Sequence, residues 1–348
     1  MVAVAVLQPG KVDIVDIPRP AAPGPYEALV RNQAAFICNA TDRKLTAGTF
    51  PGIGADKYPL LLGHESVGTV EAVGSRVRSF APGDRVIGGL LLSPTSPRYS
   101  SGWGGFSEYL IATDHTAMVA DGVADAAHGW AEVFEIMKKV PSDISLEAAA
   151  LLCTWREVYA GFSDFQLKKG DAVLIFGAGP VGLSFCRFAR LLGMSWIGVV
   201  DPLSSKRKKA ASLGAHETFS PDAPELKNLT AHRGAPLDAV IDAVGSEAIV
   251  NQALPLIKLG GSVCVYGVLV VPRITVEKDT GPYNFNLFMH QWPTRAAESA
   301  AQAPLIEWIR DGSISHTDFL TAEFPVSRVT QALKATEAPD ALKTLLRF

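Results

Sequence analysis

The sequence predicts an α/β chain in which a β-rich domain accompanies a doubly wound domain with a parallel sheet. Two features support this prediction: short strands broken by Gly and Pro over the first 120 residues, and alternating apolar strands and helices from Lys168 onward. Such alternation is typical of a parallel sheet whose two faces are covered by helices. The 348 residues are enough for two domains, since a domain has roughly 100–200 residues.

The first part of the chain predicts an irregular, mostly antiparallel β domain. Its segments LLGHESVGTVEAVG, FAPGDRVIGG and FSEYLIA alternate or run apolar for a few residues and then stop at Gly or Pro. Over 121–140, Trp130, Val133, Phe134 and Met137 recur at i, i+3, i+4 and i+7 and predict an amphipathic helix. This helix could pack on its own domain, form a lid, or contact another subunit.

The doubly wound region follows. We predict helices at 181–192, 205–213 and 246–258 and strands at 172–176, 196–200, 237–244 and 262–268. After it, a helix over 296–310 leads to a final strand, helix and strand. This last segment is too short to bury a core of its own, so we expect it to return to the β domain.

Charge and composition exclude several kinds of partner. The chain has 32 Lys plus Arg against 35 Asp plus Glu, a net charge of −3, whereas phosphate binding needs clustered excess basic residues. We therefore expect neither a nucleic acid nor a membrane as partner. Since the N-terminus does not read as a signal peptide and no run of about 18 apolar residues occurs, we expect a cytoplasmic protein.

A glycine-rich loop predicts a dinucleotide site. The sequence GAGPVG, with Pro180 and Val181 inside it, fits G-x-G-x-x-G, follows an apolar strand and opens a helix. Gly177 allows a tight turn, Gly179 lets backbone N–H groups approach a pyrophosphate, and Gly182 permits close packing of helix and strand. The positive end of the helix dipole adds to this affinity for phosphate.

The end of the next strand indicates which dinucleotide is bound. Asp201 can accept hydrogen bonds from an adenosine ribose 2′-OH and repel a 2′-phosphate, which favours NAD. Lys206 and Arg207 follow closely and could neutralise a 2′-phosphate, so NADP remains possible.

The four cysteines are too few for a disulfide scaffold in a chain of this length. Cys186 lies in a predicted helix and Cys264 in a predicted strand, so both are interpreted as packing residues. Cys38 and Cys153 lie in irregular contexts and, with His64, make the S₂N set of an open catalytic zinc site. The spacing alone does not establish a metal site.

Four segments together resemble the zinc-dependent alcohol and polyol dehydrogenases of the medium-chain dehydrogenase/reductase superfamily. They are the glycine loop with Asp201, CNATD (38–42), GHESVGTVEAVGSRVRSFAPGDRV (63–86) and FPVSRVTQALKA near the C-terminus. The resemblance implies a GroES-like catalytic domain over 1–152 and 294–348 and a Rossmann domain over 153–293. It also implies an active site in the cleft between the two domains.

The resemblance assigns roles to matching residues. Cys38, His64 and Cys153 match the catalytic zinc ligands, and Glu65 matches an acid that can approach the metal. Asp42 matches the carboxylate that orients the ligand histidine, whose free ring N–H needs a fixed acceptor.

Two further residues match less well. Thr41 is the expected proton-relay hydroxyl, although this chain has three residues between Cys38 and Asp42 where two are usual. Lys44 stands where many members carry a relay histidine, and could relay protons, contact the cofactor ribose, or simply be solvated. Residues 88–115 contain no Cys to hold the structural zinc of other members, so we expect one zinc ion per chain.

The implied activity is hydride transfer between NAD(H) and a small-molecule alcohol or its ketone or aldehyde, the alcohol being secondary, polyol or sugar-like. A zinc-free NADPH enoyl or quinone reductase and a non-catalytic NAD-binding protein are the alternatives, since fold alone does not fix function. The resemblance also implies a homodimer or homotetramer, with FNLFMHQ (285–291) as the edge strand that pairs between subunits.

Overall fold

The computed structural model describes residues 1–348, which form two compact units. The first unit consists of Met1–Thr154 and Arg295–Phe348, and the second of Trp155–Thr294. The boundary between them falls within one long helix, α3 (Leu146–Asp164). No helix in the chain combines the length and the apolar character needed to cross a membrane.

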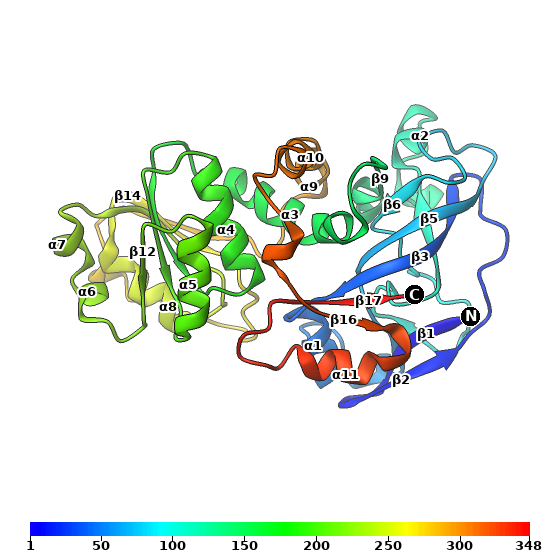
Figure 1. The fold of residues 1–348 in the computed structure, drawn as a ribbon, viewed down its shortest axis with the longest axis horizontal. Helices are drawn as coiled ribbons and strands as arrows, with labels where there is room; N and C mark the ends of the chain where they lie inside the picture. Colours follow the sequence, from blue (N-terminus) through cyan, green and yellow to red (C-terminus); the bar gives the residue numbers. More distant parts are fainter. The chain divides into compact units, whose positions relative to one another are not determined.

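The larger sheet of the first unit has seven strands. Their order is β16-β17-β3-β5-β6-β9, and β8 pairs with β3. The C-terminal strand β17 runs antiparallel to β3, with Leu346 opposite Ala35, so the end of the chain is part of the N-terminal sheet (Figure 1). The strand bounds are β3 (Glu27–Ile37), β5 (Glu65–Val73), β6 (Arg85–Ile87), β8 (Tyr109–Thr113), β9 (Lys138–Val140), β16 (Leu320–Pro325) and β17 (Lys343–Arg347).

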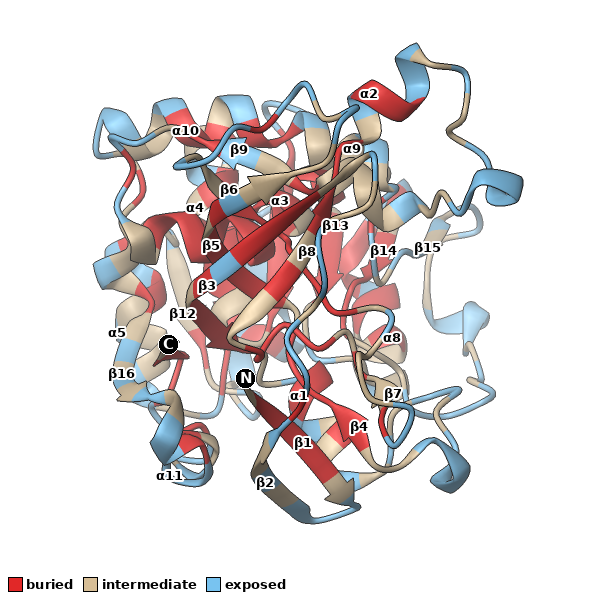
Figure 2. Cartoon of the chain, turned by 90° about the vertical axis from the view of Figure 1, so that its right-hand side faces the viewer, coloured by how far each residue is buried: buried red, intermediate tan, exposed pale blue.

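A smaller four-stranded sheet has the order β2-β1-β4-β7. Strand β1 is largely buried and β2 lies at the exposed edge (Figure 2). These strands are β1 (Val2–Gln8), β2 (Lys11–Asp16), β4 (Leu60–Leu61) and β7 (Ser100–Ser101). The helices of this unit are α1 (Thr41–Ala47), α2 (His115–Ala120), α9 (Arg295–Ala300), α10 (Gln302–Arg310) and α11 (Val329–Ala335), with 3₁₀ turns η1 (Ala55–Lys57), η2 (Ala126–His128), η3 (Glu132–Ile136), η6 (His316–Asp318) and η7 (Val326–Arg328).

The second unit is a six-stranded, fully parallel sheet in the order β12-β11-β10-β13-β14-β15. All five residues of β10 are buried, because helices cover both faces of the sheet. The elements are β10 (Ala172–Phe176), α4 (Pro180–Leu191), β11 (Trp196–Val200), α5 (Ser204–Leu213), β12 (Glu217–Phe219), α6 (Pro224–Lys227), α7 (Leu229–Arg233), β13 (Leu237–Asp242), α8 (Glu247–Ala253), η4 (Leu254–Leu256), β14 (Ile257–Val265), η5 (Lys278–Thr280) and β15 (Asn286–Met289). The predicted fold class, a β-rich domain with a doubly wound parallel-sheet domain, is confirmed.

The prediction of an amphipathic helix over 121–140 is wrong. This segment contains only the 3₁₀ turns η2 and η3 and then enters β9. Gly122 and Gly129 adopt positive φ values of 70° and 75°, which interrupt a right-handed helix and turn the chain. The apolar residues still pack inward: Met137 is buried in a core cluster, and Phe134 lies against it.

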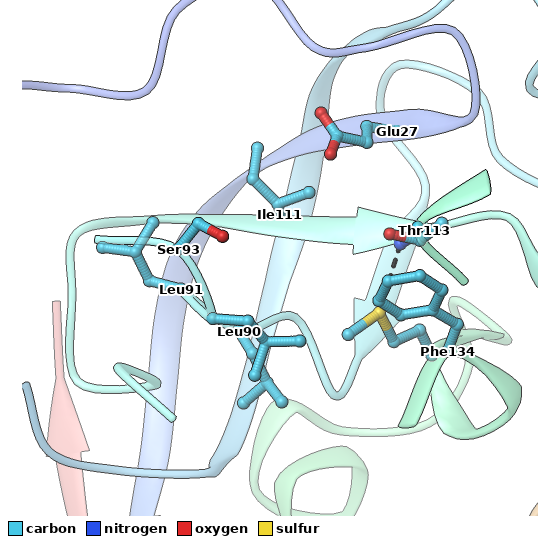
Figure 3. A pocket seen from close by; sticks show the side chains of 10 residues that line it. Glu27, Leu90, Leu91, Ser93, Ile111, Thr113 and Phe134 are labelled. Carbon is cyan, nitrogen blue, oxygen red and sulfur yellow. Dashed lines mark hydrogen bonds between the residues drawn. The ribbon is translucent and has the colours of Figure 1, made fainter. Parts of the chain in front are cut away.

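A pocket lies between this segment and strand β8 (Figure 3). Its lining includes Leu90, Ile111 and Phe134, and the Thr113 backbone N–H donates to the Met137 sulfur at 3.1 Å. Val133, Phe134 and Met137 therefore pack with Leu110 and Ala112 of β8, whereas Trp130 contacts His115.

Two other expectations need correction. The helix predicted over 246–258 ends earlier, because Pro255 lacks an N–H and forms the turn η4, after which β14 begins at Ile257. The helix predicted over 296–310 is divided into α9 and α10. Helix α1 was not predicted at all; it ends at Gly48, whose φ is 73°.

Candidate metal and cofactor sites

The first site begins where β3 ends. Cys38 follows Ile37 directly, and the next residues turn into helix α1. The Asp42 N–H donates to the Cys38 carbonyl at 3.2 Å, and the Cys38 N–H donates to Asp42 Oδ2 at 2.8 Å. The additional residue between Cys38 and Asp42 is thus taken up by one helical turn, and the carboxylate still reaches the cysteine.

His64 is placed by a glycine and held by the same carboxylate. Gly63, with φ 100°, packs so closely on the Phe106 ring that a Cβ would collide with it. His64 Nδ1 lies 3.3 Å from Asp42 Oδ1. Burial opposes charge on the imidazole, but the charge of Asp42 outweighs it and raises the pKa of His64 well above its usual value.

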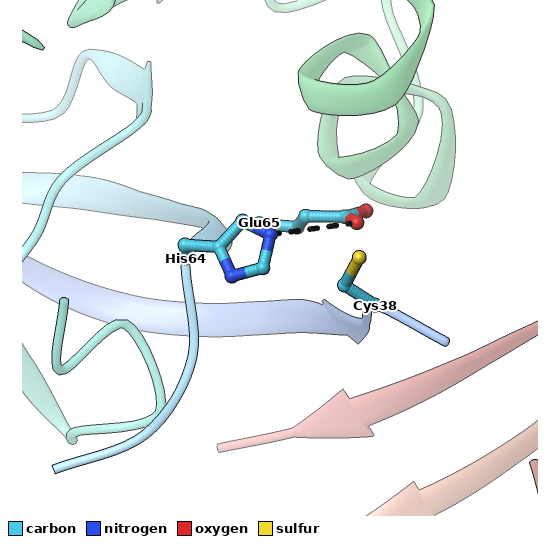
Figure 4. A group of neighbouring side chains, drawn as sticks. All are labelled: Cys38, His64 and Glu65. Atoms are coloured by element: carbon cyan, nitrogen blue, oxygen red, sulfur yellow. Dashed lines mark ion pairs between the residues drawn. The ribbon is translucent and has the colours of Figure 1, made fainter. Parts of the chain in front are cut away.

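Three different donor atoms converge here (Figure 4). The Cys38 sulfur, a His64 ring nitrogen and a Glu65 oxygen all lie within 4.8 Å of one another. Burial raises the pKa of the Cys38 thiol, but the hydrogen bond and charge of His64 lower it by more. The net effect is a lowered pKa, which favours the thiolate. Sulfur, imidazole and carboxylate are the donors that zinc takes in proteins, so the residues fit this metal.

Glu65 also makes a buried ion pair with Lys343, a residue that the sequence did not single out. The Lys343 ammonium lies 2.6 Å from both carboxylate oxygens, and Thr154 Oγ1 donates to Oε2 at 3.0 Å. The two side chains are only 3% and 4% exposed. Burial lowers the pKa of Lys343, yet Glu65 and Cys38 raise it overall. The signal in the sequence was a lysine placed between apolar residues in LKTLLRF.

The other predicted residues of this site lie around the cluster. Cys153 is buried on α3 but is not a member of the group within 4.8 Å; its charge acts on Lys343. Thr41 is buried at the start of α1, and its N–H points to the Cys38 sulfur at 3.4 Å. Partial burial lowers the pKa of Lys44, an effect that the Cys38 charge opposes.

In the second unit, the glycine loop connects β10 to α4. Gly177 has φ 94°, and its N–H donates to the Val200 carbonyl at 2.8 Å. A Cβ on Gly182 would overlap the Gly177 carbonyl oxygen, which explains the absence of a side chain there. A Cβ on Gly179 would meet no atom within 4 Å, so this side of the loop is open. Gly179 is the N-cap of α4, followed by Pro180 and Val181 in its first turn.

Asp201 directly follows β11, and its carboxylate contacts the backbone of the same glycine loop. Its Oδ2 accepts from the Ala178 N–H at 2.8 Å and its Oδ1 from the Leu203 N–H at 2.9 Å. Arg207 on α5 donates to the backbone carbonyls of Asp201 and Pro202 at 2.6 and 2.8 Å, and Lys206 beside it is partly buried.

Cys186 and Cys264 are fully buried packing residues, as expected. Burial raises the pKa of the Cys186 thiol to about 12, and it raises that of Cys264 as well. Neither is suited to bind a metal or act as a nucleophile.

Comparison with known proteins identifies the family. Residues 24–121 match the alcohol dehydrogenase GroES-like domain and residues 180–291 the zinc-binding dehydrogenase domain. A relative from Mycobacterium tuberculosis named "probable zinc-binding alcohol dehydrogenase" is 32% identical, with 77% of this chain and 68% of the relative covered. The chain belongs to the zinc-dependent alcohol dehydrogenases of the medium-chain superfamily. The enzyme is thus an NAD(P)-dependent oxidoreductase.

Two further comparisons agree with this family. The NADP-dependent isopropanol dehydrogenase of Thermoanaerobacter brockii is 30% identical to this zinc-dependent alcohol dehydrogenase, with 78% of each chain covered. The solved structure of an alcohol dehydrogenase from Thermus sp. ATN1 superposes with a TM-score of 0.78 at 25% identity, over 100% of this chain and 99% of the other. The expected combination of GroES-like and Rossmann domains is confirmed.

Proposed function

We propose that this enzyme oxidises an alcohol, and reduces the corresponding ketone or aldehyde, at a catalytic zinc ion held by Cys38 and His64, with Cys153 as the third ligand that the family resemblance implies. The observation that carries the proposal is the convergence of Cys38, His64 and Glu65 donor atoms within 4.8 Å. When bound, zinc supplies Lewis-acid stabilisation of charge on the substrate oxygen, and the nicotinamide supplies the hydride acceptor.

Asp42 positions the histidine for this role. Its carboxylate lies 3.3 Å from His64 Nδ1, on the opposite side of the ring from Nε2, which faces Glu65 at 4.0 Å. A carboxylate that holds one ring nitrogen fixes the ring orientation and leaves the other nitrogen for a metal.

Proton transfer is assigned to groups on α1. Thr41 Oγ1 accepts the proton of the substrate hydroxyl and passes its own outward. Lys44, whose pKa is lowered by partial burial, is the second candidate on this route. Glu65 pairs with Lys343 at 2.6 Å and lies close to the Cys38 sulfur.

We infer that NAD is preferred over NADP. Asp201 lies beside the glycine loop with its carboxylate fixed by two backbone N–H groups, and each oxygen keeps a lone pair for a ribose hydroxyl. Arg207 is held by backbone carbonyls and not by an acid, so its charge could still accommodate a 2′-phosphate. Asp201→Asn should lower kcat/KM with NAD and raise the NADP-to-NAD ratio; an unchanged ratio would rule out this role.

Assembly as a homodimer or homotetramer is part of the same proposal. Strand β15 lies at the edge of its sheet and pairs only with β14 along the strand order. Edge strands with free backbone groups can pair with another chain. Sedimentation analysis of the purified enzyme tests this; a monomer at micromolar concentration would exclude it.

The function itself is tested by turnover and metal content together. Purified enzyme should contain zinc and oxidise a secondary alcohol or polyol with NAD, and folded His64→Ala should lose both zinc and turnover. Turnover without zinc would favour the enoyl or quinone reductase alternative. Zinc or NAD binding with no turnover on any alcohol or carbonyl would favour a non-catalytic role.

A further inference from the structure

The backbone beside the metal site holds one bulky residue in an unfavourable conformation. Trp103 has φ 67°, in the left-handed region, where a large side chain is rare. Residues forced into such conformations cluster at functional sites, where the surrounding structure fixes them. The only other non-glycine residue of this chain with positive φ is Gln166.

The surrounding backbone holds Trp103 from both sides. The Gly102 N–H donates to the Leu61 carbonyl at 2.7 Å, the Trp103 carbonyl accepts from Leu91 at 2.9 Å, and the Gly105 N–H donates to the Gly63 carbonyl at 2.6 Å. A Cβ on Gly105 would lie 2.9 Å from the His64 backbone nitrogen. Residues 102–105 therefore pack closely against the residues leading to His64.

This arrangement brings the indole to the ligand histidine. The Trp103 and His64 ring centroids are 5.6 Å apart with an angle of 57° between the planes. On its other side, Trp103 meets Phe50 edge-on, at 5.6 Å and 80°. Both aromatic residues pack against a core cluster but are only partly buried, so Trp103 keeps exposed surface beside His64 and Phe50 extends the aromatic surface behind it.

We infer that Trp103 and Phe50 form the wall that selects the substrate, and that the preferred alcohols carry a flat apolar group, such as an aryl ring, on the carbinol carbon. This inference rests on the proposed function. Aromatic rings gain from edge-to-face or offset contact with a second ring. A polyol would instead lose hydration of its hydroxyl groups against these rings without new hydrogen bonds. The structure thus favours aryl alcohols over the polyol or sugar-like substrates that the sequence left open.

The test compares three alcohols in the zinc-containing enzyme: 1-phenylethanol, propan-2-ol and sorbitol. The wild type should prefer 1-phenylethanol. Trp103→Leu should lower the ratio of kcat/KM for 1-phenylethanol to that for propan-2-ol by about tenfold, while Trp103→Phe should largely restore it. Trp130→Leu is the matched control, because Trp130 is a partly buried tryptophan of the same unit whose indole N–H donates to His115 and which has no ring contact with His64.

A binding measurement that does not depend on turnover completes the test. Calorimetric titration with 1-phenylethanol should show weaker binding to Trp103→Leu than to the wild type and to Trp130→Leu. An equal loss of kcat/KM for all alcohols would overturn the inference, because Trp103 would then merely support His64. A wild-type preference for sorbitol would overturn the inference and leave the proposed function intact. Absence of turnover on every alcohol would instead overturn the proposed function.

Discussion

The two candidate sites handle charge differently, and each lies in its own unit. The metal site buries ionisable side chains beside one another, with Glu65 against Lys343 and Asp42 against His64. The glycine loop contains no charged side chain, and the nearby carboxylate of Asp201 is held by backbone N–H groups. One site depends on side chains from distant parts of the chain, and the other on the shape of a single loop.

This difference predicts that the two sites are destabilised by different kinds of substitution. Where buried charges compensate each other, removal of one partner leaves the other uncompensated in a low-dielectric interior. Where the backbone of a tight loop forms the site, its stability is sensitive to added side-chain atoms. The predictions below test this contrast, beginning with the largest effect.

Removal of Lys343 should cause the largest loss. Lys343→Met leaves the buried Glu65 carboxylate without its cation, and we expect the free energy of unfolding to fall by about 3–5 kcal/mol. The double variant Lys343→Met with Glu65→Gln removes both charges and should recover most of this loss. Urea unfolding of the three proteins measures the effect; a loss below about 1 kcal/mol in the single variant would contradict it.

The glycine loop should respond to added volume. In Gly182→Ala the new Cβ would overlap the Gly177 carbonyl oxygen, and overpacking of this kind costs about 1–3 kcal/mol. Gly179→Ala is the matched control, because its Cβ meets no atom within 4 Å and its φ of −74° suits alanine. We expect Gly179→Ala to change stability by less than about 0.5 kcal/mol.

The same pair of variants separates folding from cofactor binding. Both should bind NADH more weakly in a fluorescence titration, since Gly179 is where the pyrophosphate approaches the backbone. If Gly179→Ala bound NADH as tightly as the wild type, the assigned place of the pyrophosphate would be wrong.

A smaller, pH-dependent effect is expected at Asp114, a buried carboxylate of the first unit that is held by backbone groups. It accepts from the N–H groups of Arg78, Ser79 and Ala117. Burial raises the pKa of Asp114, but these hydrogen bonds lower it overall. The group therefore stabilises the fold above its unfolded pKa of about 3.9, and this contribution is lost as pH falls through the lowered folded value.

Asp114→Asn should accordingly cost about 1 kcal/mol at pH 7, and the difference from the wild type should shrink below about pH 4. Chemical unfolding at several pH values gives the comparison. A stability difference that is constant from pH 7 to pH 3 would show that the carboxylate charge has no part in it.

The contrast between the sites also explains how much of each could be predicted. The glycine loop is local in sequence, so the motif between strand and helix was sufficient to predict the turn at Gly177 and the close packing at Gly182. The metal site joins segments near residues 38, 64, 154 and 343, and no periodicity connects them. Family resemblance supplied Cys38, His64 and Asp42, whereas Lys343 was hidden in an apolar strand.

The prediction of a helix over 121–140 was wrong for a related reason. Apolar spacing at i, i+3, i+4 and i+7 is compatible with a helix, but it cannot reveal that Gly122 and Gly129 adopt positive φ. Phe134 packs against a core cluster, which agrees with the first of the alternatives left open for this segment, although the local backbone was predicted wrongly. Burial was predictable from the sequence here, and backbone conformation was decided by the glycines.

Zinc stoichiometry of the purified protein tests the central claim most directly. Elemental analysis should give about one zinc per chain in the wild type and in Cys186→Ala, a control at a buried cysteine in the second unit. Folded Cys38→Ser and His64→Ala should each have lost most of the zinc. Full retention of zinc in both variants, or equal loss from Cys186→Ala, would contradict the assignment of Cys38 and His64 as ligands.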